Sequence, residues 1–409
     1  MANVVQHVRA VVALNTAQTH TPPGAHDPPL FTPDFLFATV ANLFNSLGQQ
    51  MLLATLPVYV IALGGSRTDA GLVTAAAATT ALLVRPFVGY LTDAWRRRPV
   101  VLIGCGGYLL SSITYLMATS VPFIGLGRVV NGFALSNYTT AANTYIADIA
   151  PPRRRAEAIG FFAATQDLGL ITGPAVGFFI VGLLGFHNLF FVSLGMASLA
   201  LLCSLFARER RAQPTGSRPQ WSIRTGIVSS RALPMASIAF CLGLGFGPVN
   251  TFVSIFGQSR GIANPGLFFT VQALALLLSR TLAGRLADRR GRGVVMLPGL
   301  LAGALGLAVL PLATSLPVFF ISAALWGAGF GFAQPASMAL LVDRVRSNER
   351  GLALSTYFMG FDVGIGLGSA GFGVLSQAFG WEIMWPLAGA CVGLGWLGLL
   401  ASKIQAEVR

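Results

Sequence analysis

The chain has 409 residues, of which 54% are hydrophobic and only 10% are charged, and its formal net charge is +13. These values lie far from those of soluble domains, so they exclude a solvent-exposed globular protein and predict one embedded in a membrane. The 48 glycines fit this class, because small residues let helix backbones approach closely in lipid.

Twelve apolar stretches each approach the roughly 20 residues that a membrane-spanning helix needs. The sequence therefore predicts an all-α polytopic membrane protein, with 12 transmembrane helices in two six-helix, pseudo-symmetric bundles. The expected spans are 35–63, 68–91, 99–118, 122–148, 156–184, 187–207, 232–257, 265–287, 294–314, 317–343, 350–379 and 382–402.

An internal repeat relates the two halves. The segment R-P-F-V-G-Y-L-T-D from Arg85 resembles R-T-L-A-G-R-L-A-D from Arg280, and corresponding residues are 195 positions apart (280 − 85). One register without a gap indicates an internal duplication with a period near half the chain length. The same offset relates further pairs, among them Asp148 and Asp343, Asp167 and Asp362, and Gly173 and Gly368.

Basic residues are concentrated in alternate loops. Arginines gather after spans 2, 4, 8 and 10 and between spans 6 and 7, whereas the remaining loops hold only Arg67 and Arg260. By the positive-inside rule, the arginine-rich loops and both termini are cytoplasmic. Because topology explains the positive charge, a nucleic-acid partner is not expected.

This organisation divides the chain into a cytoplasmic N-terminal tail (1–34), a first bundle (35–207), a cytoplasmic linker (208–231), a second bundle (232–402) and a cytoplasmic C-terminal tail (403–409). The first tail carries three of the four histidines, but their spacing is not that of a ligand cluster, so no metal site is expected. The four cysteines all lie in apolar spans and are interpreted as small packing residues.

Span 1 carries a polar stripe. Asn42, Asn45, Ser46 and Gln49 follow one another at helical spacings of three and four residues within an otherwise apolar helix. Polar groups at membrane depth are tolerated where they face protein or a wet cavity. We expect the stripe to line a substrate cavity, with hydrogen bonding to neighbouring helices as the alternative.

Span 4 carries an intramembrane charge. Arg128 lies about 9 Å into the helix by helix rise, and Asn131, Tyr138 and Tyr145 follow on nearly the same face. The counterpart of Arg128 in the second half is Ala323. A duplication gives both halves the same helix arrangement, whereas a functional side chain can be present in only one of them. The unrepeated charge therefore favours a functional role, and a structural ion pair is the alternative.

Span 5 carries a carboxyl group near mid-membrane. Asp167 lies about 18 Å beyond Arg155 by helix rise, and Asp362 is its counterpart in span 11. A lone ionised carboxylate there is costly, so each is expected to be paired, hydrogen-bonded or protonated. Such groups suit proton coupling, whereas their presence in both halves equally fits a gating role.

The second half offers its own polar or aromatic candidates for substrate contact inside its spans. For each one alone, ordinary interhelical packing is the favoured interpretation. These candidates are Asn250, Gln272, Trp326, Gln334 and Tyr357.

The spans and the basic turns after spans 2 and 8 resemble the major facilitator superfamily over essentially the whole chain after the first tail. The cytoplasmic signature of that family is roughly G-x-x-x-D-R-x-G-R-R. The second copy in this chain matches it at Gly284, Asp288, Arg289, Gly291 and Arg292.

The first copy of the signature departs from the pattern, because Ala94 and Arg96 replace a basic residue and a glycine. The aspartates are expected to accept backbone N–H groups of a facing helix, and the arginines to pair with Asp148 and Asp343. Such contacts would latch one end of a transporter. The residues of the first copy that do match are Gly89, Asp93, Arg97 and Arg98.

Two further motifs resemble those of drug–proton antiporters. Arg128 with Gly132 is similar to the span 4 signature R-x-x-x-G, which is linked with proton coupling. Span 5 is similar to the antiporter signature from Gly169 through Gly173 and Pro174 to Gly177, although Phe178 replaces its last glycine. Glycines four apart give a smooth face for close helix packing, and Pro174 bends the helix.

The resemblance implies proton-coupled efflux of a small amphipathic compound by alternating access, with Asp167 and Arg128 as the hypothesised proton site because span 1 lacks the usual acidic residue. A symporter importing a sugar, organic acid or other metabolite is the alternative, because fold alone does not set direction or cargo. An enzyme is not expected, since metal, nucleophile-elbow and Walker motifs are missing. We expect a monomer in the plasma membrane without a cofactor, whose partners are a small-molecule substrate, protons and the bilayer.

Overall fold

The structure, a computed structural model, describes residues 30–94, 96–151, 154–208, 228–345 and 350–399. These residues are helical almost throughout, and none of them forms a strand. The helices are α2 (Pro33–Ala62), α3 (Arg67–Ala94), α4 (Arg97–Leu116), α5 (Val121–Ile149), α6 (Arg155–Phe206), α7 (Leu233–Ser259), α8 (Leu267–Arg290), α9 (Arg292–Val309), α10 (Leu316–Arg344), α11 (Arg350–Phe379) and α12 (Trp381–Gly393), with short 3-10 turns at η3 (Ser230–Ala232) and η4 (Leu310–Leu312).

Each expected span overlaps one of these helices within the described residues, except that α6 covers two spans, and α12 ends at Gly393 inside the expected span 382–402. Gly185 interrupts α6 with φ 81° and ψ 172°, where the fifth and sixth spans were expected to meet. Its counterpart Gly380 has φ 79° and ψ −177° and separates α11 from α12. A left-handed φ of this kind suits glycine. The two halves therefore share this backbone conformation as well as the sequence repeat.

Local sequence also explains where several helices begin. Thr32 precedes α2, and its Oγ1 accepts a hydrogen bond from the backbone N–H of Phe35 at 3.3 Å. Proline stands in the first turn of α5 and of α10, at the related positions Pro122 and Pro317. Its missing N–H and fixed φ cost nothing there. The two halves thus start these helices by the same means.

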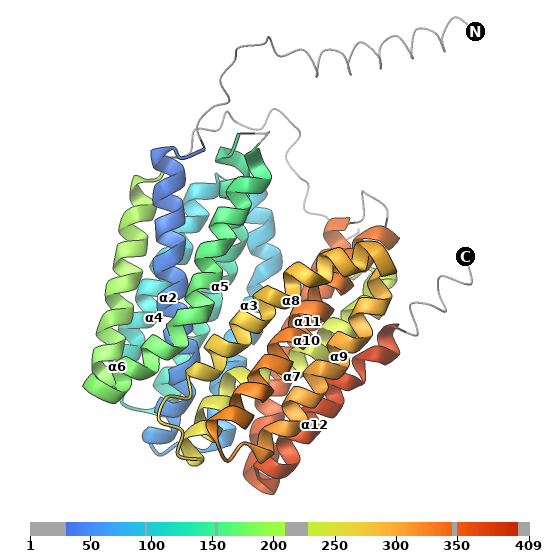
Figure 1. Cartoon of the computed structure of the whole chain (residues 1–409). Helices are drawn as coiled ribbons and strands as arrows, with labels where there is room; N and C mark the ends of the chain where they lie inside the picture. Colours follow the sequence, from blue (N-terminus) through green and yellow to red (C-terminus); the bar gives the residue numbers. More distant parts are fainter. Residues whose placement is uncertain (1–29, 95, 152–153, 209–227, 346–349, 400–409) are drawn as a thin grey trace, which may run out of the picture.

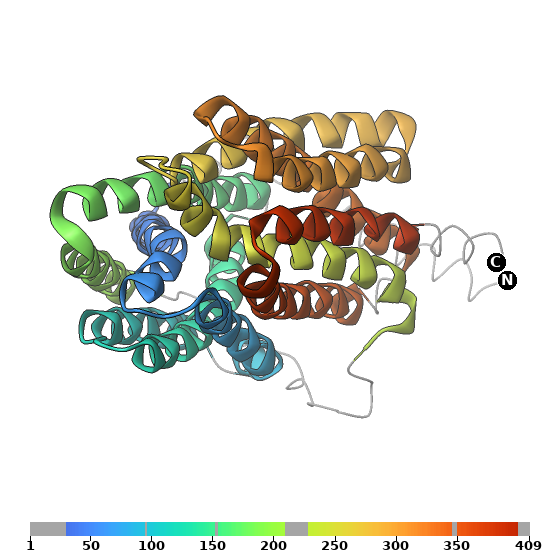
Figure 2. The ribbon, with the colours of Figure 1, turned by 90° about the horizontal axis from the view of Figure 1, so that it is seen from below.

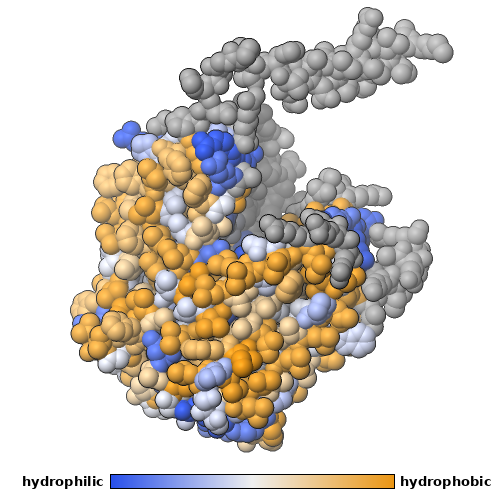
Figure 3. All heavy atoms as spheres, in the orientation of Figure 1, coloured by the Kyte–Doolittle hydropathy of each residue, from blue (hydrophilic) through white to orange (hydrophobic). Residues whose placement is uncertain are grey.

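The outer surface is apolar over a broad band (Figure 3). Seven helices in the described part of the chain are long and apolar enough to cross a membrane by length and composition. An apolar band of this kind suits lipid and would be a liability in water. The chain is therefore a multi-pass membrane protein. Exposed side chains on its surface include Leu83, Phe179, Leu183, Leu278 and Leu305.

The helices form two groups in space, α2–α6 and α7–α12 (Figures 1 and 2). The groups touch where α3 packs on α11, α6 on α8, and α2 on α7. In Figure 1 they meet at the lower end and diverge toward the upper end, and the surface is hollowed between them at that upper end in Figure 3. We call these the closed end and the open end. The open end carries the first residues of α2 and α6 (Figure 1).

Candidate functional site

A cavity of about 80 Å³ lies within the first bundle. All four residues of the polar stripe of α2 lie in its wall. Its walls come from α2, α4, α5 and α6, and consist of Asn42, Asn45, Ser46, Gln49, Gln50, Tyr108, Leu135, Tyr138, Thr139, Ala142, Asn143, Phe162 and Gln166.

The glycines of α6 hold the stripe in place. Gly169 and Gly173 lie so close to Ser46 and Gln50 of α2 that a methyl group on either glycine would collide with them. The expected smooth packing face is thus confirmed. This close approach lets the Ser46 hydroxyl donate to the Gln166 carbonyl oxygen at 3.0 Å. Interhelical hydrogen bonding, the alternative role of the stripe, therefore accompanies cavity lining.

The amide nitrogen of Asn42 is used by this packing, whereas the amide oxygen of Asn45 is not. Asn42 Nδ2 donates to the Phe162 carbonyl oxygen at 3.1 Å and to Thr165 Oγ1 at 2.9 Å. Asn45 is only 4% exposed, and its Nδ2 donates to Cys105 Sγ at 3.5 Å. Its Oδ1 accepts no hydrogen bond from the described residues. A buried acceptor without a donor is destabilising, so this oxygen is a candidate ligand contact.

Gln49 continues the polar surface toward the closed end. Its Oε1 accepts from Asn131 Nδ2 at 2.9 Å. Arg128, one turn from Asn131, is 6% exposed and lies beside the ring hydroxyl of Tyr115, with which it interacts electrostatically. Tyr145, further along the same helix, donates to the Arg208 carbonyl oxygen at 2.9 Å.

Two pairs of opposite charges face each other between the bundles. Arg85 Nη2 of α3 lies 3.3 Å from Asp362 Oδ2 of α11. Asp167 of α6 lies within electrostatic range of Arg280 of α8. The 195-residue offset converts one pair into the other. The structure thus gives Asp167 and Arg128 different neighbours, and it does not bring these two together as a single site.

Two further ion pairs lie inside the bundles, and they confirm the expected pairing of the signature arginines with aspartates. Arg97 Nε lies 3.3 Å from Asp148 Oδ2, and Arg292 Nη1 pairs with Asp343 Oδ2. These pairs are again related by the offset. Arg98 instead donates to the Leu205 carbonyl oxygen at 2.6 Å. Five other latch candidates have side chains outside the described residues: Gly89, Asp93, Gly284, Asp288 and Arg289.

The closed end is joined by contacts that the sequence analysis did not single out. Arg67 Nη1 donates to the Ser376 carbonyl oxygen at 2.8 Å, and its guanidinium lies 4.0 Å from the ring centroid of Trp381. Thr270 Oγ1 donates to the Ile171 carbonyl oxygen at 2.7 Å. The sequence hinted at these contacts only through Arg67, because it is one of two arginines in the loops that otherwise lack them.

Matching glycines bring the bundles together at the same end. A methyl group on Gly71 of α3 would collide with the Ser369 carbonyl group of α11, and one on Gly266, just before α8, with the Pro174 carbonyl group of α6. The 195-residue offset relates Gly71 to Gly266, and it relates Pro174 to Ser369. The two interfaces are therefore pseudo-symmetric, and Pro174 belongs to one of them.

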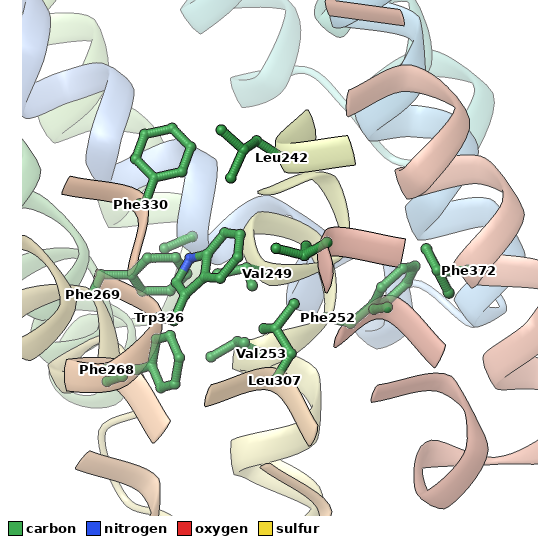
Figure 4. Close-up of a cluster of buried hydrophobic side chains, with 14 of the residues drawn as sticks. Leu242, Val249, Phe252, Val253, Phe268, Phe269, Leu307, Trp326, Phe330 and Phe372 are labelled. Carbon is green, nitrogen blue, oxygen red and sulfur yellow. The ribbon is translucent and has the colours of Figure 1, made fainter. Parts of the chain in front are cut away.

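The candidates of the second bundle are packed rather than gathered around the cavity. Trp326 is 0% exposed and lies among Phe268, Phe269 and Phe330 (Figure 4). Hydrogen bonds hold Asn250, Tyr357 and the main chain of Gln334, whereas Gln272 Oε1, like Asn45 Oδ1, accepts none from the described residues. Asn250 Nδ2 donates to the Phe246 carbonyl oxygen at 3.0 Å, Tyr357 shares a 2.7 Å hydrogen bond with Ser337, Gln272 is 2% exposed, and the carbonyl oxygen of Gln334 accepts from Ser337 at 2.7 Å.

Sequence comparison links the chain to known transporters. A model of the Major Facilitator Superfamily matches residues 38–268 and 235–406. Multidrug resistance protein 2 of Bacillus subtilis is 25% identical over 281 residues, which cover 65% of this chain and 70% of that protein. The class B tetracycline resistance protein of Escherichia coli is 25% identical over 332 residues, or 77% of this chain and 81% of that protein.

Structural comparison points to the same architecture. The crystal structure of the nucleoside transporter NupG superposes with a TM-score of 0.74 and covers 90% of this chain and 98% of its own, at 16% identity. This likeness concerns the fold.

Proposed function

The chain belongs to the Major Facilitator Superfamily, and from this premise we propose that it is a secondary active transporter that exports small amphipathic compounds in exchange for protons. Twelve transmembrane helices in two bundles form the transport unit, with the termini and the open end in the cytoplasm, where the positive-inside rule places the arginine-rich loops. Export is supported by the two relatives that are named for drug resistance.

The observation that carries the proposal is the crossed pair of charges between the bundles. Arg85 and Asp362 form an ion pair, and Asp167 lies within electrostatic range of Arg280. Each carboxylate is attracted by an arginine of the opposite bundle. Because the attraction needs an ionised carboxylate, a proton on either aspartate weakens the force between the bundles.

The position of these charges suits alternating access. Arg85 lies 18 residues along α3 from Arg67, about 27 Å by helix rise, and so well beyond the contacts of the closed end. Arg85 and Asp362 lie 3.3 Å apart while the cytoplasmic end is open, so cargo from the cytoplasm meets the carboxylates in the ionised state. Protons from outside neutralise the carboxylates in the outward-facing form, and they leave to the cytoplasm when the ion pairs form again. A cargo bound in the ionised state then moves against the proton flow.

A reconstitution experiment tests this function. Purified protein in liposomes is given an imposed pH gradient, and the internal pH and the concentration of a labelled cargo are followed together. Exchange predicts that protons and cargo move in opposite directions and that a protonophore abolishes cargo accumulation. Movement in the same direction would instead identify the importing symporter, and cargo flux indifferent to the gradient would contradict proton coupling altogether.

A further inference from the structure

We propose, on the basis of the transport function above, that the first bundle alone recognises the cargo, and that this cargo is an uncharged aromatic compound carrying hydroxyl or amide hydrogen-bond donors. Five observations support this assignment: the one-sidedness of three polar residues, the filling of the equivalent space in the second bundle, the unsatisfied Asn45 oxygen, the neutral lining of the cavity, and a pair of tyrosine rings in its wall.

Two amides of the polar stripe and one of the facing helix have apolar counterparts in the repeat, whereas Asn42 corresponds to the polar Ser237. The 195-residue offset places Phe240 at the position of Asn45, Leu244 at that of Gln49, and Phe361 at that of Gln166. Since the second bundle packs without amides at these three positions, and polar groups in a membrane are costly, the amides favour a ligand site in the first bundle beside their interhelical hydrogen bonds.

The space that is hollow in the first bundle is filled in the second. Trp326 stands at the position of Asn131, and its indole packs against Gly245 and Gly303. Those two glycines occupy the positions of Gln50 and Tyr108, which line the cavity. Figure 4 shows the indole surrounded by buried apolar side chains. The second bundle thus has an indole where the first has room for a ligand.

The side chains that line the cavity favour a neutral compound that carries hydrogen-bond donors. None of the side chains that line the cavity is charged, so a cation or anion entering it would lose water without gaining a counter-charge there. Amide groups both donate and accept, which suits hydroxyl and amide groups of a neutral cargo. Asn45 Oδ1 in particular has no donor among the described residues.

An aromatic ring on the cargo is favoured by a pair of tyrosines in the wall. The rings of Tyr108 and Tyr138 meet edge to face with centroids 5.8 Å apart, and both line the cavity. A planar group can pack against such a pair while its polar substituents reach the amides of α2.

The test uses the full-length protein with two probes of drug size: chloramphenicol, a neutral nitrophenyl amide with two hydroxyl groups, and ethidium, a lipophilic cation. Binding is measured by equilibrium dialysis, and transport in liposomes under a pH gradient. The variants Asn45→Leu and Gln49→Leu remove an amide each, and the second introduces the residue that the repeat carries. Asn250→Leu, which removes a buried amide of the second bundle that bonds to its own helix, is the matched control.

We expect the unaltered protein to bind and move chloramphenicol, and each first-bundle variant to weaken binding about tenfold, as loss of one or two hydrogen bonds predicts. The control should retain the affinity. If Asn45→Leu lowers the unfolding temperature, Gln49→Leu decides the matter. Proton-driven movement of ethidium without chloramphenicol binding would overturn the cargo class and leave the exchange function standing. Unchanged chloramphenicol affinity in Gln49→Leu would overturn the location, and failure of both probes to move would overturn both proposals.

Discussion

Arg85 of α3 and Asp362 of α11 form an ion pair between the two bundles, with Nη2 and Oδ2 3.3 Å apart. Its pseudo-symmetric counterpart joins Arg280 of α8 to Asp167 of α6 by electrostatic attraction. The duplicated chain thus places Asp167 and Asp362 each opposite an arginine of the other half. The relative position of the halves is therefore sensitive to the ionisation of two carboxyl groups.

The first prediction concerns the charge of Asp362. Asp362→Asn keeps the size of the side chain and removes its charge, so we expect proton-driven cargo accumulation to fall by about tenfold or more, while exchange of labelled for unlabelled cargo without a gradient persists. Both are measured in liposomes. Glu157→Gln is the matched control, because Glu157 bonds to Arg154 within its own helix start. Accumulation that survives Asp362→Asn intact would exclude this residue as a proton carrier.

A second prediction tests the pairing of Arg85 with Asp362. Arg85→Asp places two carboxylates opposite each other, and Asp362→Arg places two guanidinium groups there, so each single change should reduce transport. The double exchange restores opposite charges and should recover a substantial part of the activity, giving a non-additive double-mutant cycle. Additive losses in the four transport rates would show that the two groups act independently.

A third prediction concerns the glycine contacts at the closed end. Gly71→Ala and Gly266→Ala introduce a methyl group against a carbonyl of the opposite bundle, so this end should open and the population should shift to the outward-facing form. Spin-label distances across the end report the shift. Gly106→Ala, where the added methyl group meets nothing within 4 Å, is the control. Equal distances in all three variants would contradict the role of the glycines.

A fourth prediction separates gating from stability at the ion pairs inside the bundles. The Asp343 side chain is 52% exposed, and exposed ion pairs contribute only about 0–1 kcal/mol. Asp343→Asn should therefore leave the unfolding temperature almost unchanged while it slows transport, if the pair orders the turn that meets the opposite bundle. Thermal unfolding and transport are measured on the same preparation. A large loss of stability with proportionate loss of transport would assign the pair a purely structural role.

Much of this arrangement was predictable because it is periodic. Helical spacing placed Asn42, Asn45 and Gln49 on one face, and that face does line the cavity. The signature motif placed Arg97 and Arg292 at helix ends near Asp148 and Asp343, and these pairs form. In both cases the relevant distance runs along a helix or between adjacent helix ends, which sequence spacing fixes.

Partners across the bundles were not predictable in this way. Helix rise gave the depth of Arg128 and Asp167, but it does not give the direction in which each side chain points. Arg128 faces Tyr115 of its own bundle, whereas Asp167 faces the opposite one. Trp326 attracted notice as a polar aromatic group, yet its volume fills a gap left by two glycines far away in sequence. Such complementarity appears only when the helices are assembled.

The indole-filled half has an evolutionary consequence. After duplication, one copy filled this space with an indole, while the other kept a cavity lined by a few amides. Selection for a new toxin or nutrient can therefore act on those amides alone, and the rocking machinery is inherited unchanged.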